Sequence, residues 1–434
     1  MKLADTIRAA WQEPELRQRL LFIFAIFGVY AIALHIAVPV PGLSLETIKK
    51  LIEGNGYLNF MNMLGGGALK KLSVFALGLN PYITASIIMQ LVKVAVPALK
   101  KEAMEGDQHS RQQMAKRTRV LTIILCIFQG IGLLTMIGAG GIPVFAKFQV
   151  ICFWTAGAMM MLWLGEQIQD KGIGQGVSLM IFAGIVVSFP YIGEDLGRQI
   201  SAGTVQAYQV ILLVSAIVAM TALIVLFTLA QRRIHIHHMR RTVGGTTKQI
   251  GGSSTYLPIP VNAVGVIPII FAMALIFIPA QFSTMLPAGS PIANFFSEIS
   301  QFLSPRPSSV WYHWVVGSIA YSALIFFFTY FYTAIQFNVE DLASHLRRSG
   351  AYIPGVRQGK QTEQYLDGVI SRITVVGALF LAVISLLPFW LPSLLGLGPQ
   401  LQVIGGTSLL IIVSVVLDLM RQIESNLLMR GYQK

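Results

Sequence analysis

The sequence has 434 residues, of which 54% are apolar and only 12% are charged. Soluble domains carry roughly 25% charged residues because their surface faces water, so this composition excludes an ordinary soluble enzyme or binding domain. The formal net charge is +13, and most of the 32 Lys and Arg lie in the terminal segments or in alternate loops between apolar runs. An excess of Lys and Arg marks the cytoplasmic side of a membrane protein, so both termini are expected in the cytoplasm.

The N-terminal residues 1–19 place Leu3, Ile7 and Trp11 on one helical face with basic residues around it, which predicts a short helix at the membrane interface. Runs of about 20 mostly apolar residues follow, the length that crosses ~30 Å of hydrocarbon as a helix. There are ten of them: 20–38, 74–96, 120–138, 149–168, 177–192, 208–230, 263–280, 313–337, 369–389 and 403–420.

Two sets of five runs predict an all-α membrane protein built from two five-helix halves, compatible with an inverted repeat. The N-terminal half is expected at residues 20–192 and the C-terminal half at 193–420, with a cytoplasmic tail at 421–434. No convincing sequence identity relates the halves, so their pseudo-symmetry is an expectation from topology.

Residues 57–72 precede the second run and are too short and too polar at their end to span the bilayer. Gly65, Gly66 and Gly67 permit a sharp bend there. On the extracytoplasmic side, this pattern predicts a re-entrant segment that folds back among the helices. An ordinary extracytoplasmic loop is the alternative.

Two prolines fall inside apolar runs at comparable places in the two halves. Pro81 lies in the second run and Pro268 in the seventh. A proline inside a helix removes a hydrogen bond and kinks the axis, so the pair predicts two broken helices that line a cavity or move. Ordinary kinks are the alternative for either proline alone.

Two cytoplasmic loops are long. In 231–262, polar and apolar residues alternate from Arg233 to His237 before a glycine pair, which predicts a β-hairpin. In 338–368, a helical pattern stops at Gly350 and a turn rich in Pro and Gly follows. Loops of this length and charge are plausible docking sites for a soluble partner, whereas a purely topology-setting role explains their charge but not their length.

Recognisable catalytic chemistry is missing. The sequence has no GxxxxGK[ST] loop, and the GxGxG spacing of residues 172–176 does not fit the dinucleotide fingerprint. His235, His237 and His238 alternate across a predicted hairpin without a nearby carboxylate, so no metal site and no cofactor is expected. Charged residues sit at the ends of the runs rather than at their centres, which disfavours a proton-coupled transporter.

Several long blocks resemble the SecY family of protein-translocation channels. They are GGGALKKLSVFALGLNPYITASIIMQL (65–91), LWLGEQIQDKGIGQGVSLMIFAGIV (162–186), LPIPVNAVGVIPIIFA (257–272), FNVEDLASHLRRSGAYIPGVRQGKQTEQYLDGVISRIT (337–374) and IGGTSLLIIVSVVLDLMRQIES (404–425). The resemblance extends from about Pro14 to Tyr432. It implies a bacterial plasma-membrane channel that is not an enzyme, with two five-helix halves around an hourglass pore.

The resemblance also implies roles for individual residues. The constriction ring of the pore falls on Leu79, Ile83, Ile181, Ile270 and Ile411. The re-entrant segment corresponds to the plug of the family, and Gly65, Gly66 and Gly67 to its hinge. Gln90, Gln129 and Asn262 are the polar candidates at a lateral gate between the second and third spans and the seventh and eighth.

The family's partners are implied in the same way. They are the small membrane subunits SecE and SecG, the SecA motor, the ribosome, and secretory preproteins with their signal peptides, in a lipid bilayer and without sequence-specific binding of nucleic acid. The expected docking residues are Arg240, Arg241, Arg347, Arg348 and Arg357. Val339 and Gln358 depart from the family pattern, which has proline at both positions of this docking loop.

Two readings outside this family remain from the residues alone. A small-solute transporter or ion channel would need convergent polar groups at the midplane, and the runs offer chiefly Asn80, Thr84 and Ser178. A purely structural membrane scaffold would leave the re-entrant segment and the interrupted helices without a purpose.

Overall fold

The computed structural model describes residues 11–40, 48–49, 51–52, 56–96, 99, 108–138, 143–203, 206–238, 254–262, 264–286, 290–305, 311–394 and 406–431. Each of the ten apolar runs overlaps a helix, which confirms the all-α membrane fold. These helices are α2 (Pro14–Ala33), α5 (Asn80–Ala95), α7 (Gln108–Met136), α8 (Val144–Lys171), α9 (Gly176–Ser201), α10 (Ala207–Leu229), α11 (Ile267–Met285), α13 (Trp311–Gln336), α15 (Lys360–Leu394) and α16 (Gly406–Gly431).

Length and hydropathy separate these helices into two groups. In the described part of the chain, seven are long and apolar enough to cross a membrane: α2, α7, α8, α9, α10, α13 and α15. The apolar part of α11, Ile267–Ser283, is shorter, α5 has only 16 residues, and α16 has 26 residues but is not among the seven. The helix α5 is short because residues 65–79 before it form buried turns rather than a helix.

The apolar core follows the division into halves. One cluster joins α7 and α8 to residues 38–77 and includes Trp154 and Cys126, both fully buried. A second cluster joins α10, α11, α13, α15 and α16 around Tyr321 and Ile325. A third lies between the halves, since it combines residues of α2, α8 and α9 with Ile411 of α16. Two cores and a central contact are therefore the physical basis of the two-half architecture.

The expectation about the two prolines is wrong. Pro81 and Pro268 do not interrupt helices, because α5 begins at Asn80 and α11 begins at Ile267, which places both prolines in the first turn. The first helical turn tolerates proline, since its N–H groups have no intrahelical partner there. Prolines that do lie inside described helices include Pro190 in α9, Pro279 in α11 and Pro388 in α15.

Element bounds also differ from the domain limits expected from hydropathy. The described residues 14–19 already belong to α2, while residues 1–10 lie outside the described part of the chain. The limit expected at 192 falls within α9, which continues to Ser201, so the halves divide between α9 and α10. Residue 421 lies within α16, which continues to Gly431. Polar ends extend these helices beyond their apolar runs.

The long cytoplasmic loops fold as one unit. The predicted hairpin is confirmed: β1 (Gln231–His238) pairs antiparallel with β2 (Ser254–Pro260). The second loop forms α14 (Val339–Arg348), which ends before Gly350 at φ +67°, and then β3 (Ala351–Tyr352), which pairs with the other edge of β1. Ile234, Ile236 and Leu346 share an apolar cluster with the start of α15. Both loops are therefore packed together on α15.

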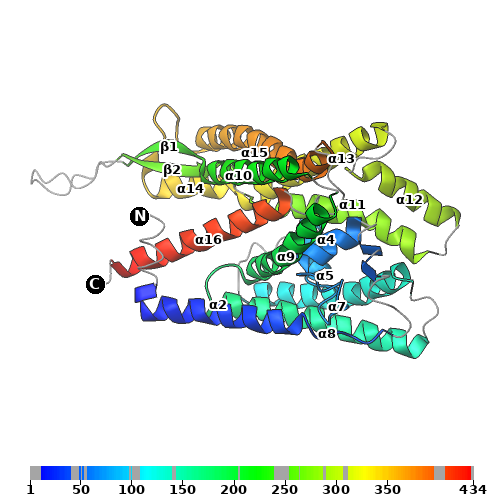
Figure 1. Cartoon of the computed structure of the whole chain (residues 1–434). Coiled ribbons are helices and arrows are strands. Elements are labelled where there is room, and N and C mark those ends of the chain that lie inside the picture. The colour runs from blue at the N-terminus through cyan, green and yellow to red at the C-terminus, as the bar shows by residue number, and fades with distance from the viewer. Residues whose placement is uncertain are drawn as a thin grey trace, which may run out of the picture.

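Figure 1 shows the orientation of these parts. The strands β1 and β2, the first turns of α2 and the last turns of α16 lie at one end of the molecule. The amphipathic helix α12 (Pro291–Leu303), which the hydropathy pattern did not predict, lies at the opposite end between α11 and α13. The short helix α4 (Gly56–Leu64) lies in the interior beside α9 and α5.

Candidate functional site

The structure brings the five expected residues of the constriction ring into one apolar cluster. They come from four helical elements, because Leu79 precedes α5, Ile83 lies in α5, and the other three lie in α9, α11 and α16. Leu79, Ile181 and Ile411 are buried, and Ile83 and Ile270 are partly buried against them. No single element supplies the ring, so it exists only when both halves are in contact.

A cavity of about 280 Å³ lies on one side of the ring. Ile181, Ile270 and Ile411 contribute to its wall, together with polar residues from the start of α9 and the middle of α16. These polar residues are Gln175, Ser178, Ser414, Asp418 and Arg421. Along α16 these residues follow Ile411 toward the C-terminal end, which lies at the same end of the molecule as the β-hairpin, so the cavity is on the cytoplasmic side of the ring (Figure 1).

The helix α4 lies on the other side of the ring. The hydroxyl of Ser188 in α9 donates a hydrogen bond to the carbonyl oxygen of Met63 over 3.2 Å. The hydroxyl of Ser408 in α16 lies 3.1 Å from the sulfur of the same Met63. A Cβ atom at Gly184 would overlap the carbonyl oxygen of Leu64, so α4 and α9 approach at backbone distance.

Cavity, ring and α4 therefore follow one another in the same order along two helices. In α9 the order is Ser178, Ile181 and then Ser188. In α16 it is Ser414, Ile411 and Ser408, read against the chain direction. Since α9 and α16 come from different halves, this order describes one axis through the molecule.

The re-entrant segment has the bend expected from its glycines. Gly66 and Gly67 have φ of +70° and +81°, which is left-handed backbone that favours glycine. A Cβ atom at Gly66 would also lie 2.6 Å from the Tyr30 hydroxyl. Asn62 closes the bend, because its carbonyl oxygen accepts from the amide of Gly67 and its side chain accepts from the amide of Lys70. The segment therefore enters as α4 and returns through a tight turn.

Of the three polar candidates at the gate, Gln90 has a partner across the two halves. Its side-chain oxygen accepts a hydrogen bond from the hydroxyl of Tyr332 in α13. Gln129 is buried in α7, and Asn262 borders the cavity. Among the described residues, the Gln129 side-chain oxygen and the Asn262 amide nitrogen have no hydrogen-bond partner. Sequence reasoning missed Tyr332, since nothing in a run of aromatic residues distinguishes it.

A second contact between the halves is aromatic. The ring centroids of Phe128 in α7 and Phe282 in α11 are 5.6 Å apart. Phe282 also stacks on Phe296 of α12 at 5.5 Å. Phe128 and Phe282 lie in the outer parts of their helices, whereas Gln90 and Tyr332 lie near the cytoplasmic ends of theirs. The two halves are therefore in contact through an aromatic pair toward the extracytoplasmic side and a polar pair near the cytoplasmic side.

The exposed arginines lie on the cytoplasmic unit. Arg347 and Arg348 are exposed in the last turn of α14, and Arg357 is exposed in the turn before α15. The Thr362 hydroxyl donates to the carbonyl oxygen of Arg357 over 2.9 Å and fixes the backbone of that turn. Arg240 and Arg241 lie outside the described residues.

The two departures from the family pattern have local structural partners. Val339 is the first residue of α14, a position where proline and other residues are both tolerated, and Asn338 caps the helix by accepting from the amide of Asp341. The side-chain amide of Gln358 donates to the carbonyl oxygen of Ala351 in β3 over 3.3 Å. This bond closes the turn that carries Arg357.

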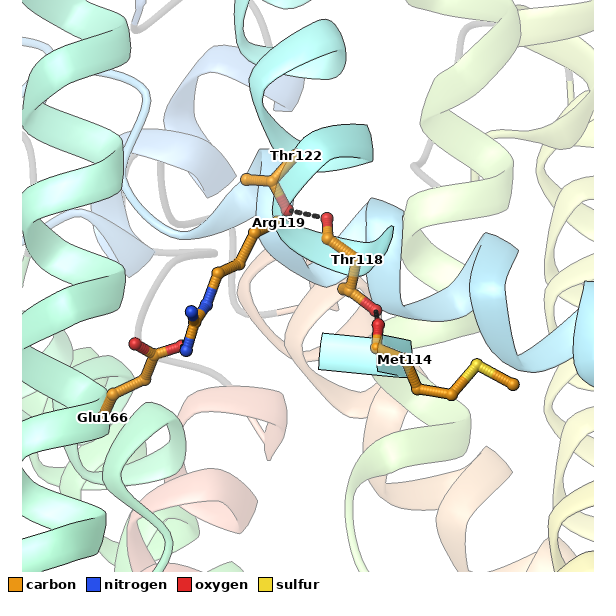
Figure 2. Close-up of polar contacts among 5 residues, drawn as sticks. All are labelled: Met114, Thr118, Arg119, Thr122 and Glu166. Carbon is orange, nitrogen blue, oxygen red and sulfur yellow. Dashed lines mark hydrogen bonds and ion pairs between the residues drawn. The ribbon is translucent and has the colours of Figure 1, made fainter. Parts of the chain in front are cut away.

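Charged residues are not confined to the helix ends, since Asp418 lies within α16 and Arg119 within α7. Arg119 at the cytoplasmic part of α7 forms an ion pair with Glu166 of α8, with Nη2 and Oε1 2.8 Å apart (Figure 2). Thr118, directly before Arg119, and Thr122, one turn after it, donate to the backbone carbonyls of Met114 and Thr118. Within the described part of the chain, no group of three or more His, Cys, Asp and Glu is placed to hold a metal ion.

Comparisons with known proteins agree on one family. The profile of the SecY family matches residues 73–420. Protein translocase subunit SecY of Thermotoga maritima is 39% identical, with 99% of this chain and 97% of the relative covered. The subunit of the same name from Pseudomonas aeruginosa is 38% identical, with 96% and 92% covered.

Solved structures share the fold at lower identity. A structure of SecY, determined in work on its plug domain, has a TM-score of 0.64 at 22% identity, covering 93% of this chain and 91% of that one. Sec61 in the canine ribosome–channel complex from the endoplasmic reticulum has a TM-score of 0.61 at 19% identity, with the same coverage.

Proposed function

The chain belongs to the SecY family, and on this premise we propose how its residues conduct polypeptides. It is a channel subunit and not an enzyme. Unfolded secretory polypeptides cross the bacterial plasma membrane through its axis, and apolar segments leave sideways into lipid. A small-solute transporter is disfavoured, because the relatives that cover nearly the whole chain are translocase subunits.

The observation that carries this proposal is the order of cavity, ring and α4 along α9 and α16. A polypeptide enters the polar cavity from the cytoplasm and meets the aliphatic ring of Leu79, Ile83, Ile181, Ile270 and Ile411. Aliphatic side chains make no strong directional bonds, so they can close around an extended chain of any sequence. The same side chains close the axis by dewetting when no chain is present.

The re-entrant segment is the plug in this proposal. The plug domain of the solved SecY protein stabilises the closed state of its channel and maintains a membrane seal. In this chain, α4 lies against the ring on its extracytoplasmic side, and Gly65, Gly66 and Gly67 form the bend at which it can swing away. Movement of α4 requires loss of the contact between Ser188 and Met63.

The lateral gate lies where α5 and α7 meet α11 and α13. The hydrogen bond between Gln90 and Tyr332 keeps the gate closed near the cytoplasmic side. The aromatic contact between Phe128 and Phe282 keeps it closed toward the extracytoplasmic side. A signal sequence with an apolar core of 7–15 residues inserts between these helices and favours the open arrangement. Central Leu gains roughly 0.5 kcal/mol in the membrane whereas Arg or Asp costs roughly 2.5–3.5 kcal/mol, so apolar segments leave through the gate and polar ones continue along the axis.

Energy and assembly come from partners. The chain has no nucleotide-binding loop, so a motor such as SecA or a translating ribosome drives transport, and SecE and SecG complete the membrane complex. The Sec61 neighbour, which was solved in a ribosome–channel complex, supports the ribosome as one partner. The exposed Arg347, Arg348 and Arg357, and Arg240 and Arg241 in the hairpin loop, are the proposed docking residues.

Site-specific crosslinking of a stalled secretory chain tests the proposal. Cys126 and Cys152 are first changed to Ala, and single cysteines then replace Ile181 or Ile411. Adducts at both positions that depend on a functional signal sequence are expected, since both residues line the ring. Adducts confined to the lipid-exposed control positions Leu226 and Val218 would contradict the pore assignment and favour the solute-transporter hypothesis.

A further inference from the structure

Three polar side chains meet on the extracytoplasmic surface beside the bend of the re-entrant segment. The ammonium group of Lys71 donates to the hydroxyl of Tyr191 over 2.7 Å and lies 3.0 Å from Nε2 of His35. The same ammonium group lies 4.9 Å from the centroid of the Tyr191 ring, within the range of a cation–π contact. His35 lies two residues after the end of α2, Lys71 follows the bend and Tyr191 belongs to α9.

The hydrogen bonds fix which ring nitrogen of His35 faces Lys71. Nδ1 of His35 lies 2.9 Å from the carbonyl oxygen of Ala31, and a carbonyl oxygen can only accept, so Nδ1 carries the proton. In the neutral ring, Nε2 is then an acceptor and takes a hydrogen bond from Lys71. Two of the three N–H groups of the ammonium therefore have partners, His35 just after α2 and Tyr191 on α9.

The backbone beside Lys71 is hydrogen-bonded to the segment that follows α2. The amide of Val38 donates to the carbonyl oxygen of Leu72, and the amide of Val74 donates to that of Ile36. Ser73 pairs with Ala37 in an isolated antiparallel bridge. The backbone that carries Lys71 is therefore fixed to the segment after α2, whereas its partner Tyr191 belongs to α9.

Tyr191 also touches the bend itself. A Cβ atom at Gly67 would lie 3.8 Å from two carbon atoms of the Tyr191 ring, so the ring packs at van der Waals distance over the hinge glycine. On the same helix, one turn before, Ser188 holds the carbonyl oxygen of Met63 in α4. The bond from Lys71 therefore keeps α9 against both the hinge and the short helix.

We propose that His35, Lys71 and Tyr191 form a latch that holds the hinge of the plug closed in the resting channel. This inference rests on the proposed function, since it assumes that α4 closes the channel. The latch is outside the ring and the gate, and it acts by positioning α9 over Gly67 rather than by touching the translocating chain. Its loss raises the probability that the resting channel is open.

Single-channel recording of the complex with its small membrane subunits in planar lipid bilayers, without a translocating chain, tests the latch. The frequency of spontaneous openings is measured rather than the unit conductance, which a change of charge alters directly. Lys71→Met and Tyr191→Phe are expected to raise this frequency by about three- to tenfold, the range for losing one partly exposed charge-assisted hydrogen bond. Tyr191→Phe keeps the ring on Gly67, so it removes only the hydroxyl and leaves the packing intact.

Matched variants make the result decisive. Lys49→Met removes an exposed positive charge from the same extracytoplasmic connection and is expected to behave like the unaltered protein. Lys71→Arg keeps a charged donor, so its frequency of spontaneous openings is expected to stay near that of the unaltered protein. Deletion of residues 57–64 tests the plug independently of the latch. Frequent openings after the deletion with none after Lys71→Met and Tyr191→Phe would overturn the latch alone. A quiet channel after the deletion would overturn the plug assignment on which it rests.

Discussion

The hydroxyl of Tyr332 donates a hydrogen bond to the side-chain oxygen of Gln90 and so joins α13 of the C-terminal half to α5 of the N-terminal half. The two residues are 242 positions apart in the sequence. The amide nitrogen of Gln90 donates to the hydroxyl of Ser86 on its own helix. In the proposed lateral gate, the bond between Tyr332 and Gln90 must break before α5 and α13 can separate.

Tyr332→Phe removes that bond while keeping the ring. One neutral hydrogen bond contributes about 1 kcal/mol, so the open arrangement is expected to gain about fivefold in population. Export of a reporter with a defective signal sequence should rise in cells that depend on the variant. Tyr330→Phe is the matched control, because the Tyr330 hydroxyl donates to Ser371 within the same half. Strict rejection of the defective signal by Tyr332→Phe would remove Tyr332 from the gate.

Ile411→Asn places an amide in the aliphatic ring. Ile411 is 4% exposed, and a polar group there attracts water into the constriction and weakens closure by dewetting. The variant is expected to export proteins whose signal sequences are defective. Val416→Asn puts the same amide at an exposed position of α16 and should not relax the requirement. Equal behaviour of the two variants would argue against a role of Ile411 in closure.

Gly184→Ala tests the close approach of α9 and α4. The added Cβ atom would overlap the carbonyl oxygen of Leu64, so α4 must move away from its resting position. Spontaneous openings of the reconstituted complex are expected to increase at least severalfold. At Gly193 of the same helix a Cβ atom meets nothing within 4 Å, so Gly193→Ala serves as the control. A Gly184→Ala channel as quiet as the control would show that α4 does not close it from this position.

Arg357→Glu reverses an exposed charge in the proposed docking turn. Motor-driven export is expected to fall by at least tenfold, while insertion of the variant into the membrane stays normal because Arg357 lies in a cytoplasmic turn outside the helices. Export into inverted membrane vesicles and membrane fractionation measure the two effects. Lys360→Glu makes the same reversal at the exposed start of α15 and should retain most activity. Normal export by Arg357→Glu would remove this residue from the docking surface.

The sequence predicted the parts of the fold that depend on local hydropathy and backbone propensity. Each apolar run became a helix, and the alternation from Arg233 to His237 became β1. Local signals also led to one error. Pro81 and Pro268 were expected inside helices because both lie within apolar runs, yet each begins a helix, and hydropathy does not distinguish a buried turn from a helix.

The sequence by itself determined that this chain spans the membrane repeatedly, which way it is oriented and, through its blocks, which family it resembles. The tertiary structure decided that Tyr332 meets Gln90, that Lys71 bridges His35 and Tyr191, and that cavity, ring and α4 share one axis. Periodicity reports which face of a helix is apolar, whereas the partner of that face depends on how two halves far apart in the sequence pack. For that reason the candidate residues of the ring could be named from the blocks, but the contacts between Tyr332 and Gln90 and around Lys71 could not.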